Sequence, residues 1–78
     1  MKLIDYLNFL PVIERSEFAV SCGTTVGYLR KACSMGQLIG PETCVAIEQV
    51  SAGRVTRTEL RPDDWARIWP ELIEKAIA

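Results

Sequence analysis

Histidine is absent from this 78-residue sequence, and its three cysteines, Cys22, Cys33 and Cys44, include no closely spaced pair. Structural zinc sites usually need such a pair, so we expect no metal site. An odd number of cysteines also argues against a disulfide framework. The alternative, which we expect, is that each cysteine lies on the inner face of a helix as a small hydrophobic side chain.

The sequence also lacks an excess of positive charge, because nine Lys and Arg against ten Asp and Glu give a formal net charge of −1. This balance argues against a strongly basic nucleic-acid-binding domain, although a basic face can still form locally. No apolar run is long enough to span a membrane. The N-terminus, with one lysine and a short mixed segment before Pro11, does not resemble a signal peptide. We therefore expect a cytoplasmic protein.

Side chains arranged for catalysis are scarce. The sequence has no cluster of metal ligands and no phosphate-binding glycine loop. The adjacent carboxylates Asp63 and Asp64 suit the start of a helix better than acid–base chemistry. We predict that the protein is not an enzyme and that it needs neither a cofactor nor a small-molecule substrate.

What is present indicates one small helical domain. Hydrophobic residues make up 49% of the sequence, which is enough for a core, and no repeat, linker or convincing strand pattern interrupts it. We predict a single domain over residues 1–78 with an all-α fold. The expected form is a compact bundle of five or six short helices, with a C-terminal helical extension from about residue 63.

Leucines at helical spacing predict an amphipathic first helix over residues 2–10, namely Leu3, Leu7 and Leu10. Pro11 ends this helix, since the residue before a proline avoids the helical region. The next two residues, Val12 and Ile13, are expected to pack beneath the second helix.

Residues 15–36 predict two short helices joined by a tight turn around Gly23. The first begins near Arg15 or Ser16, with Ser16 as its N-cap. The second runs from Thr25, its N-cap, to Met35, and Gly36 follows as its C-cap. This spacing is typical of a helix-turn-helix.

The outer face of the Thr25 to Met35 helix combines a small residue with two cations, at Gly27, Arg30, Lys31 and Ser34. A glycine inside a helix costs about 1 kcal/mol relative to alanine. Gly27 is therefore either a neutral change on a solvated face or a place where a partner approaches the backbone. Our hypothesis is that this helix lies in the major groove of DNA.

Further along, Leu38 and Ile39 are expected to be buried in a short loop, and Pro41 suits the first position of a helix that ends near Val50 or Ser51. Cys44 and Ile47 point inward from this helix, whereas Val45 points away. A capping box over residues 56–59, with Thr56 as N-cap and Glu59 reaching back, begins a short helix that ends near Leu60.

The C-terminal segment carries a hydrophobic stripe at Trp65, Ile68, Trp69 and Leu72, and Pro70 is expected to kink or split it. The tryptophans either cover the core of the domain itself or form a dimer interface. Three nearby cations serve the same interface or a solvated surface: Arg54, Arg57 and Arg61.

Residues 15–36 resemble the helix-turn-helix of phage Cro and Cro-like, lambda-repressor-like repressors, at Ala19, Gly23, Leu29, Lys31, Ala32 and Gly36. Residues 41–62 more specifically resemble the YdaS-like regulators of the Cro superfamily. That group carries Pro-x-x-Cys-x-x-Ile-Glu, then Gly-x-Val-Thr and Leu-Arg-Pro. The matching positions are Pro41, Cys44, Ile47, Glu48, Gly53, Val55, Thr56, Leu60, Arg61 and Pro62.

The resemblance implies a prophage or bacterial transcriptional regulator, either a Cro-like repressor or an antitoxin-type regulator. It also implies that a homodimer binds a palindromic operator in double-stranded DNA. By position, the residues that would approach bases or phosphates are Thr25, Val26, Gly27, Arg30 and Lys31. Those that would flank them on the DNA backbone are Arg15, Ser16 and Gln37.

The sequence departs from the family pattern at the tip of this helix. Val26 and Gly27 replace polar residues that often read bases, and Tyr28 stands where a small residue is common. Direct readout is therefore expected from Thr25, Tyr28 and Arg30, with Val26 against a thymine methyl group. The sparse polar tip and the net charge of −1 motivate the alternative, a protein-interaction module that keeps the fold without binding DNA.

Overall fold

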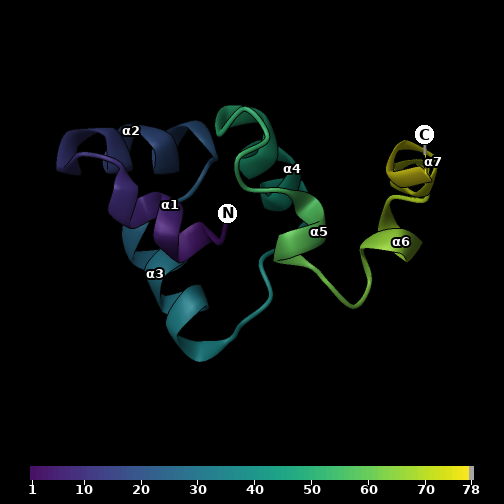
Figure 1. Ribbon diagram of the computed structural model, residues 1–78. Coiled ribbons are helices and arrows are strands. Elements are labelled where there is room, and N and C mark those ends of the chain that lie inside the picture. Colours follow the sequence, from purple (N-terminus) through teal and green to yellow (C-terminus); the bar gives the residue numbers. More distant parts are fainter. Residues whose placement is uncertain (78) are drawn as a thin grey trace.

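Seven helices make up residues 1–77, the part of the chain that this computed structural model describes, with side chains described as far as Glu74. In chain order they are α1 (Leu3–Phe9), α2 (Val12–Ser21), α3 (Val26–Met35), α4 (Pro41–Val50), α5 (Arg57–Leu60), α6 (Trp65–Ile68) and α7 (Glu71–Ile77) (Figure 1). The all-α prediction is confirmed. The number of helices exceeds the predicted five or six because Pro70 splits the last helical segment into α6 and α7.

The core lies where α1, α3, α4 and the segment before α5 meet. Its completely buried side chains are Leu7, Leu29, Cys44, Ile47 and Val55, each 0% exposed. Cys22 is also buried and Cys33 is half-buried, and all three cysteines are free thiols. The prediction that the cysteines serve as small hydrophobic side chains is thus confirmed at Cys22 and Cys44 and holds in part at Cys33.

Helix α2 begins earlier than its sequence indicates. The expected start near Arg15, with Ser16 as N-cap, is wrong, because α2 starts at Val12 with Pro11 in the N-cap position. Pro11 has φ −57° and ψ 154°, an extended conformation from which a helix can begin at the next residue. Ser16 therefore lies inside α2.

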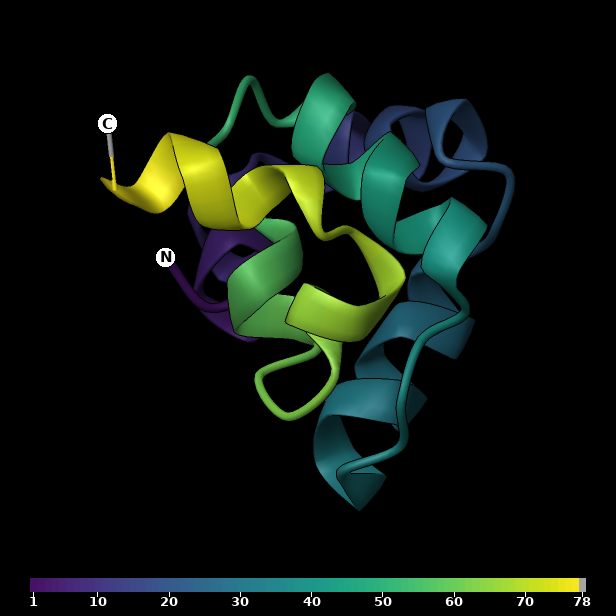
Figure 2. The same cartoon turned by 90° about the vertical axis from the view of Figure 1, so that its right-hand side faces the viewer.

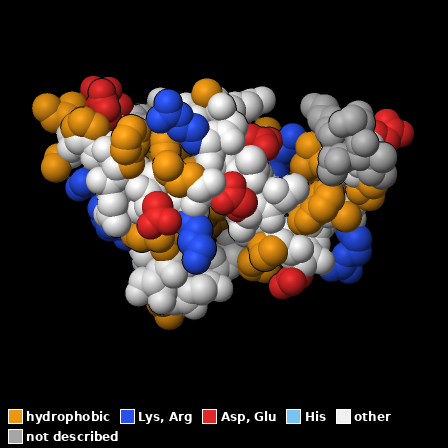
Figure 3. Space-filling model, viewed as in Figure 1, with side chains coloured by type: hydrophobic (Ala, Val, Ile, Leu, Met, Phe, Trp, Pro, Cys, Tyr) orange, Lys and Arg blue, Asp and Glu red, His pale blue; other side chains and the backbone are white. Residues whose placement is uncertain are grey.

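The first turn of α2 also faces solvent, which corrects the expectation that it packs underneath. Val12 is 71% exposed and Ile13 is 74% exposed. Together with the exposed Phe9 they belong to the corner where α1 meets α2, an end of the molecule where Figure 3 shows hydrophobic side chains gathered. The end of α1 is closed by a polar contact from Arg15, one turn further along α2, and not by these hydrophobic residues.

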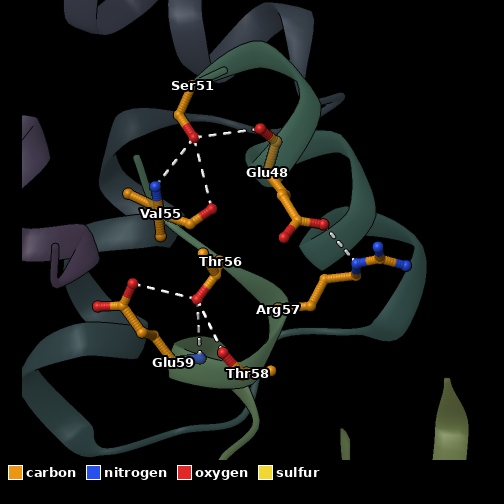
Figure 4. Close-up of polar contacts among 7 residues, drawn as sticks. All are labelled: Glu48, Ser51, Val55, Thr56, Arg57, Thr58 and Glu59. Carbon is orange, nitrogen blue, oxygen red and sulfur yellow. Dashed lines mark hydrogen bonds and ion pairs between the residues drawn. The ribbon is translucent and has the colours of Figure 1, made fainter. Parts of the chain in front are cut away.

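A buried hydroxyl organises the connection between α4 and α5 (Figure 4). Ser51, only 2% exposed, accepts a hydrogen bond of 3.1 Å from the backbone N–H of Val55. Its own hydroxyl lies 3.3 Å from the carbonyl oxygen of Glu48 and 3.4 Å from that of Val55. The turn also needs left-handed backbone, at Ala52 (φ 55°) and Gly53 (φ 81°).

Helix α5 starts with the predicted capping contact. The Thr56 hydroxyl accepts a hydrogen bond from the backbone N–H of Glu59 at 3.3 Å and donates to the Glu59 carboxylate at 3.1 Å (Figure 4). The N-terminal amine lies 2.9 Å from the same carboxylate. Burial alone would raise the pKa of Glu59, but hydrogen bonds from the N-terminal amine and Thr56 outweigh it and lower that pKa.

Two predictions about α4 and the loop before it need correction. Ile39 is buried, as expected, but Leu38 is 55% exposed, because adjacent side chains of a non-helical connection point in different directions. Val45 does not point away from the core; it is half-buried and packs against it. Pro41 does occupy the first position of α4, as predicted.

The C-terminal segment packs on the domain itself. Trp69 is buried at 8% exposure, and Trp65, Ile68 and Leu72 pack against the core around it. Figure 3 shows the hydrophobic side chains of this segment on the side that faces the rest of the molecule. These contacts support the first of the two interpretations of the tryptophans, packing within the domain.

Nearby cations hold this segment in place. Arg57 lies over the Trp69 ring at 5.3 Å from its centroid and pairs with Glu48. Arg61 donates to Asp64 at 2.8 Å and to the carbonyl oxygen of Ile39 at 2.7 Å.

In both ribbon views α7 lies on the opposite side of the molecule from α3 (Figures 1 and 2). The C-terminal segment therefore leaves α3 uncovered.

Among the described residues, every helix falls short of the length and hydrophobicity that a membrane-spanning helix needs. Within the same part of the chain, acidic and cysteine side chains nowhere gather in a group of three or more that could hold a metal ion.

Candidate nucleic-acid interface

The two helices of the 15–36 region are joined by a tight connection. After α2 ends at Ser21, the N–H of Cys22 bonds back to α2 carbonyls, and Gly23 adopts φ 77°, a left-handed conformation that suits glycine. The N–H of Thr24 then donates to the Ala19 carbonyl at 2.9 Å. The chain therefore turns sharply within residues 22–25.

Helix α3 has strong signals at both ends. The Thr25 side chain accepts a hydrogen bond from the backbone N–H of Tyr28 at 3.1 Å, which confirms Thr25 as the N-cap. Gly36 closes the other end in a left-handed conformation with φ 63°, and the N–H of Gln37 returns to the Ala32 carbonyl at 2.9 Å. The predicted bounds of this helix are confirmed.

The inner face of α3 is rigidly packed. Leu29 is 0% exposed and Ala32 is 2% exposed, and α3 contacts both α1 and α2. Because this face is fixed in the core, the direction of the outer face is fixed as well. The residues exposed on that face are Gly27, Lys31 and Ser34.

Gly27 has no intramolecular reason to be glycine. A Cβ built at this position would meet only the Thr25 hydroxyl oxygen, at 4.0 Å, and the backbone conformation is one that any L-residue adopts. An alanine would therefore fit the isolated protein. The bare backbone at Gly27 is open to solvent near the N-terminus of α3.

Two cations follow Gly27 on α3, and no acidic residue belongs to this helix. Lys31 is exposed and makes no ion pair with the side chains that the structure describes, through Glu74. Arg30 is half-buried and donates from both terminal nitrogens to the side-chain oxygen of Asn8, at 3.2 Å each. Because Asn8 is neutral, the positive charge of α3 is not cancelled there.

Arg15 has a different position from that implied by the family resemblance. Its Nε donates to the carbonyl oxygens of Leu7 at 2.6 Å and Leu10 at 2.9 Å. These are C-terminal carbonyls of α1 that have no partner within the helix, so the guanidinium caps α1. Asn8 belongs to the same helix end.

Three other residues lie near the tip of α3. Ser16, Thr25 and Val26 help to line a shallow hollow of about 200 Å³ between α2 and the start of α3. Tyr28 is 40% exposed, on the same turn of α3. These side chains are thus brought together with Gly27 at one end of the helix.

Gln37 is separated from this group. It lies after the opposite end of α3 and helps to line a groove of about 410 Å³ between α1, the end of α3 and α5. The sequence, in turn, gave no sign of Asn8, which contacts Arg30 across 22 positions. No motif or spacing links these two residues, because their contact depends on how α1 crosses α3.

The fold and this site define an all-helical protein in which two ten-residue helices, α2 and α3, are joined by a tight glycine turn, which is consistent with a helix-turn-helix. Residues 17–68, more than half of the chain, match the family described as bacterial toxin YdaS, and the chain belongs to that family. The match runs from within α2 to the end of α6 and confirms the YdaS-like resemblance. A search of curated proteins found no match.

Proposed function

We propose that the protein is a sequence-specific DNA-binding regulator that inserts α3 into the major groove. The observation that supports this most is the outer face of α3, where exposed backbone at Gly27 is followed by Arg30 and Lys31. An α-helix fits the major groove, and cations along it neutralise phosphates.

The distribution of charge supports the proposal although the net charge is −1. Two arginines of the opposite half of the molecule are engaged by carboxylates, Arg57 with Glu48 and Arg61 with Asp64. On α3, Arg30 has only a neutral partner and Lys31 has no acidic one among the described side chains. The two charges of α3 therefore remain available to phosphates, as do those of Lys2, Arg54 and Arg67, which also lack an ion pair among the described side chains.

The roles proposed for individual residues follow from their chemistry. Lys31 binds a phosphate as a point charge, and Arg30 binds a base edge or a phosphate. Val26 contacts a thymine methyl group, while Thr25 and Tyr28 offer hydroxyl groups. Ser16 flanks them on the DNA backbone. Arg15 is proposed to contribute mainly by capping α1, and Gln37 to touch DNA only at the margin.

A two-fold operator needs a dimer, so we propose that two copies bind inverted half-sites. We do not assign the dimer interface to the C-terminal segment, because its tryptophans already pack within one copy. Sedimentation of the protein with and without a bound duplex tests this: two copies per duplex are expected, and one copy per duplex contradicts it.

A second candidate function is a toxin that acts through a protein target. The family's description as a bacterial toxin and the exposed Val12, Ile13 and Val20 of α2 favour it. Hydrophobic residues of this size on one exposed helix are common at protein interfaces.

Fluorescence anisotropy with random-sequence and selected duplexes, over a range of salt concentrations, distinguishes the two functions. DNA binding through α3 predicts affinity that falls steeply with salt. Replacing Lys31 by alanine should reduce the slope of log K against log salt by about one. Arg67→Ala, which removes an exposed cation of α6 in the C-terminal segment, is the control and should leave the slope unchanged. Absence of salt-dependent binding to any duplex would rule out the first function.

A further inference from the structure

Arg30 ends on an acceptor that another helix provides. Its Nη1 and Nη2 each lie 3.2 Å from Oδ1 of Asn8 in α1. A guanidinium has five N–H donors in one rigid plane. One N–H from each terminal nitrogen faces Asn8, which leaves Nε–H and the two outer N–H groups without an acceptor among the side chains described through Glu74.

Asn8 is itself held in position. Arg15 of α2 binds the carbonyls on either side of it in the chain, those of Leu7 and Leu10, and its Nη2 lies 3.4 Å from the Asn8 carbonyl oxygen. The end of α1 is therefore fastened to α2. Hydrogen bonds from Arg15 and Arg30 to Asn8 therefore connect α2 and α3 to the end of α1, next to the proposed DNA-reading face.

We propose that Asn8 is a positioning residue that fixes the Arg30 guanidinium for reading guanine. This inference rests on the proposed DNA binding. With its end held by Asn8, the guanidinium presents its other edge, Nε–H beside an outer N–H. That edge carries two parallel donors, and guanine is the base that offers two acceptors, O6 and N7, in the major groove.

The neutrality of Asn8 is part of this role. An aspartate would hold the same guanidinium more tightly but would cancel its charge and weaken attraction to DNA. An alanine at position 8 would leave the charge of Arg30 unchanged but release its side chain. Arg30 would then have to give up its rotamer freedom at the moment of binding DNA. Asparagine gives orientation without neutralisation.

The first test needs no DNA. Relaxation of the Arg30 ¹⁵Nε–H signal in the free protein should report an ordered side chain in the wild type and a more mobile one in Asn8→Ala. Gln49→Ala, which truncates an exposed amide on α4, is the matched control and should not change the signal. An Arg30 side chain equally mobile in wild type and Asn8→Ala would overturn the proposal, whatever its affinity for DNA.

The second test measures base preference by anisotropy, on the tightest duplex selected from a random pool and on its single-base-pair variants. Arg30→Ala identifies the position where the guanine preference is lost. At that position Asn8→Ala should lower the preference about tenfold. The upper limit is a loss of roughly thirtyfold, which corresponds to the full rotamer entropy of an arginine side chain. Asn8→Ala should add no further loss in the Arg30→Ala background.

Asn8→Asp extends this test, because it keeps the acceptor oxygen. It should retain the guanine preference while weakening binding to all duplexes alike. A preference that Asn8→Ala leaves unchanged, or a loss equal on all duplexes, would overturn the positioning role while leaving DNA binding intact. A wild-type protein that binds no duplex would overturn DNA binding as well.

Discussion

Gly27 is the position at which stability and DNA binding are predicted to move in opposite directions. In the isolated protein a methyl group at this site fits without a clash, since its nearest neighbour is the Thr25 hydroxyl oxygen at 4.0 Å. Inside a helix, alanine is more stabilising than glycine by about 0.5–1 kcal/mol. Gly27→Ala should therefore raise the free energy of unfolding by about this amount, and the melting temperature by about 2–8 °C for a domain of this size.

The effect on binding has the opposite sign if the bare backbone of α3 lies against the groove. A methyl group inserted into a close-packed contact costs about 1–3 kcal/mol. This corresponds to a dissociation constant higher by about five- to 140-fold. The loss should be similar on all duplexes, because it comes from the approach of the backbone and not from one base.

The assay combines urea unfolding with anisotropy on the tightest selected duplex. Ser34→Ala is the matched control: it improves helix propensity on the same exposed face but removes atoms where Gly27→Ala adds them. Ser34→Ala should stabilise the protein and leave affinity nearly unchanged. If Gly27→Ala binds DNA as tightly as the wild type, the close approach of the backbone at Gly27 is refuted.

Arg15→Ala should lower the free energy of unfolding by about 1.5–3 kcal/mol, because the end of α1 loses charge-assisted hydrogen bonds, and urea unfolding with unchanged stability would contradict this. Among the thiols, Cys33 should react first with a thiol reagent at pH 8, because burial raises the pKa of each of the other two to about 11; mass spectrometry that finds them labelled equally fast would refute this. The hydrogen bond from Arg61 lowers the pKa of Asp64. The pairing of Asp64 with Arg61 therefore stabilises the fold fully above the usual aspartate pKa, and this stabilisation is lost as the pH falls through the lowered pKa. Melting temperatures of Asp64→Asn should therefore depend less on pH in this acidic range than those of the wild type, and parallel pH profiles would contradict the pairing.

Most helix ends could be predicted because their signals are local, and the start of α2 at Val12 is the exception. Thr25, Gly36 and Pro41 act through the backbone conformation or hydrogen bonds of their immediate neighbours, and the structure has each in its predicted place. Pro70 likewise divides the C-terminal segment by its own geometry. Local chemistry of this kind is fully visible in a sequence.

Burial and side-chain pairing could be predicted less well, because they depend on which elements cross. Val12, Ile13 and Leu38 have the hydrophobicity of core residues but lie at a helix end or in a loop that no other element covers. The outer face of α3 was predicted from its spacing. The contact of Arg30 with Asn8 was not, since it joins two helices whose crossing the sequence does not specify.

Selection of bound duplexes from a random pool, followed by sequencing, tests the central claim most directly. If two copies insert α3 into successive major grooves, the selected sequences should contain inverted half-sites whose centres lie about 10–10.5 base pairs apart, or a multiple of this spacing. Each half-site should contain a guanine whose selection disappears with Arg30→Ala. A pool that shows no enriched sequence after repeated rounds, with the protein folded throughout, would contradict sequence-specific DNA binding by α3.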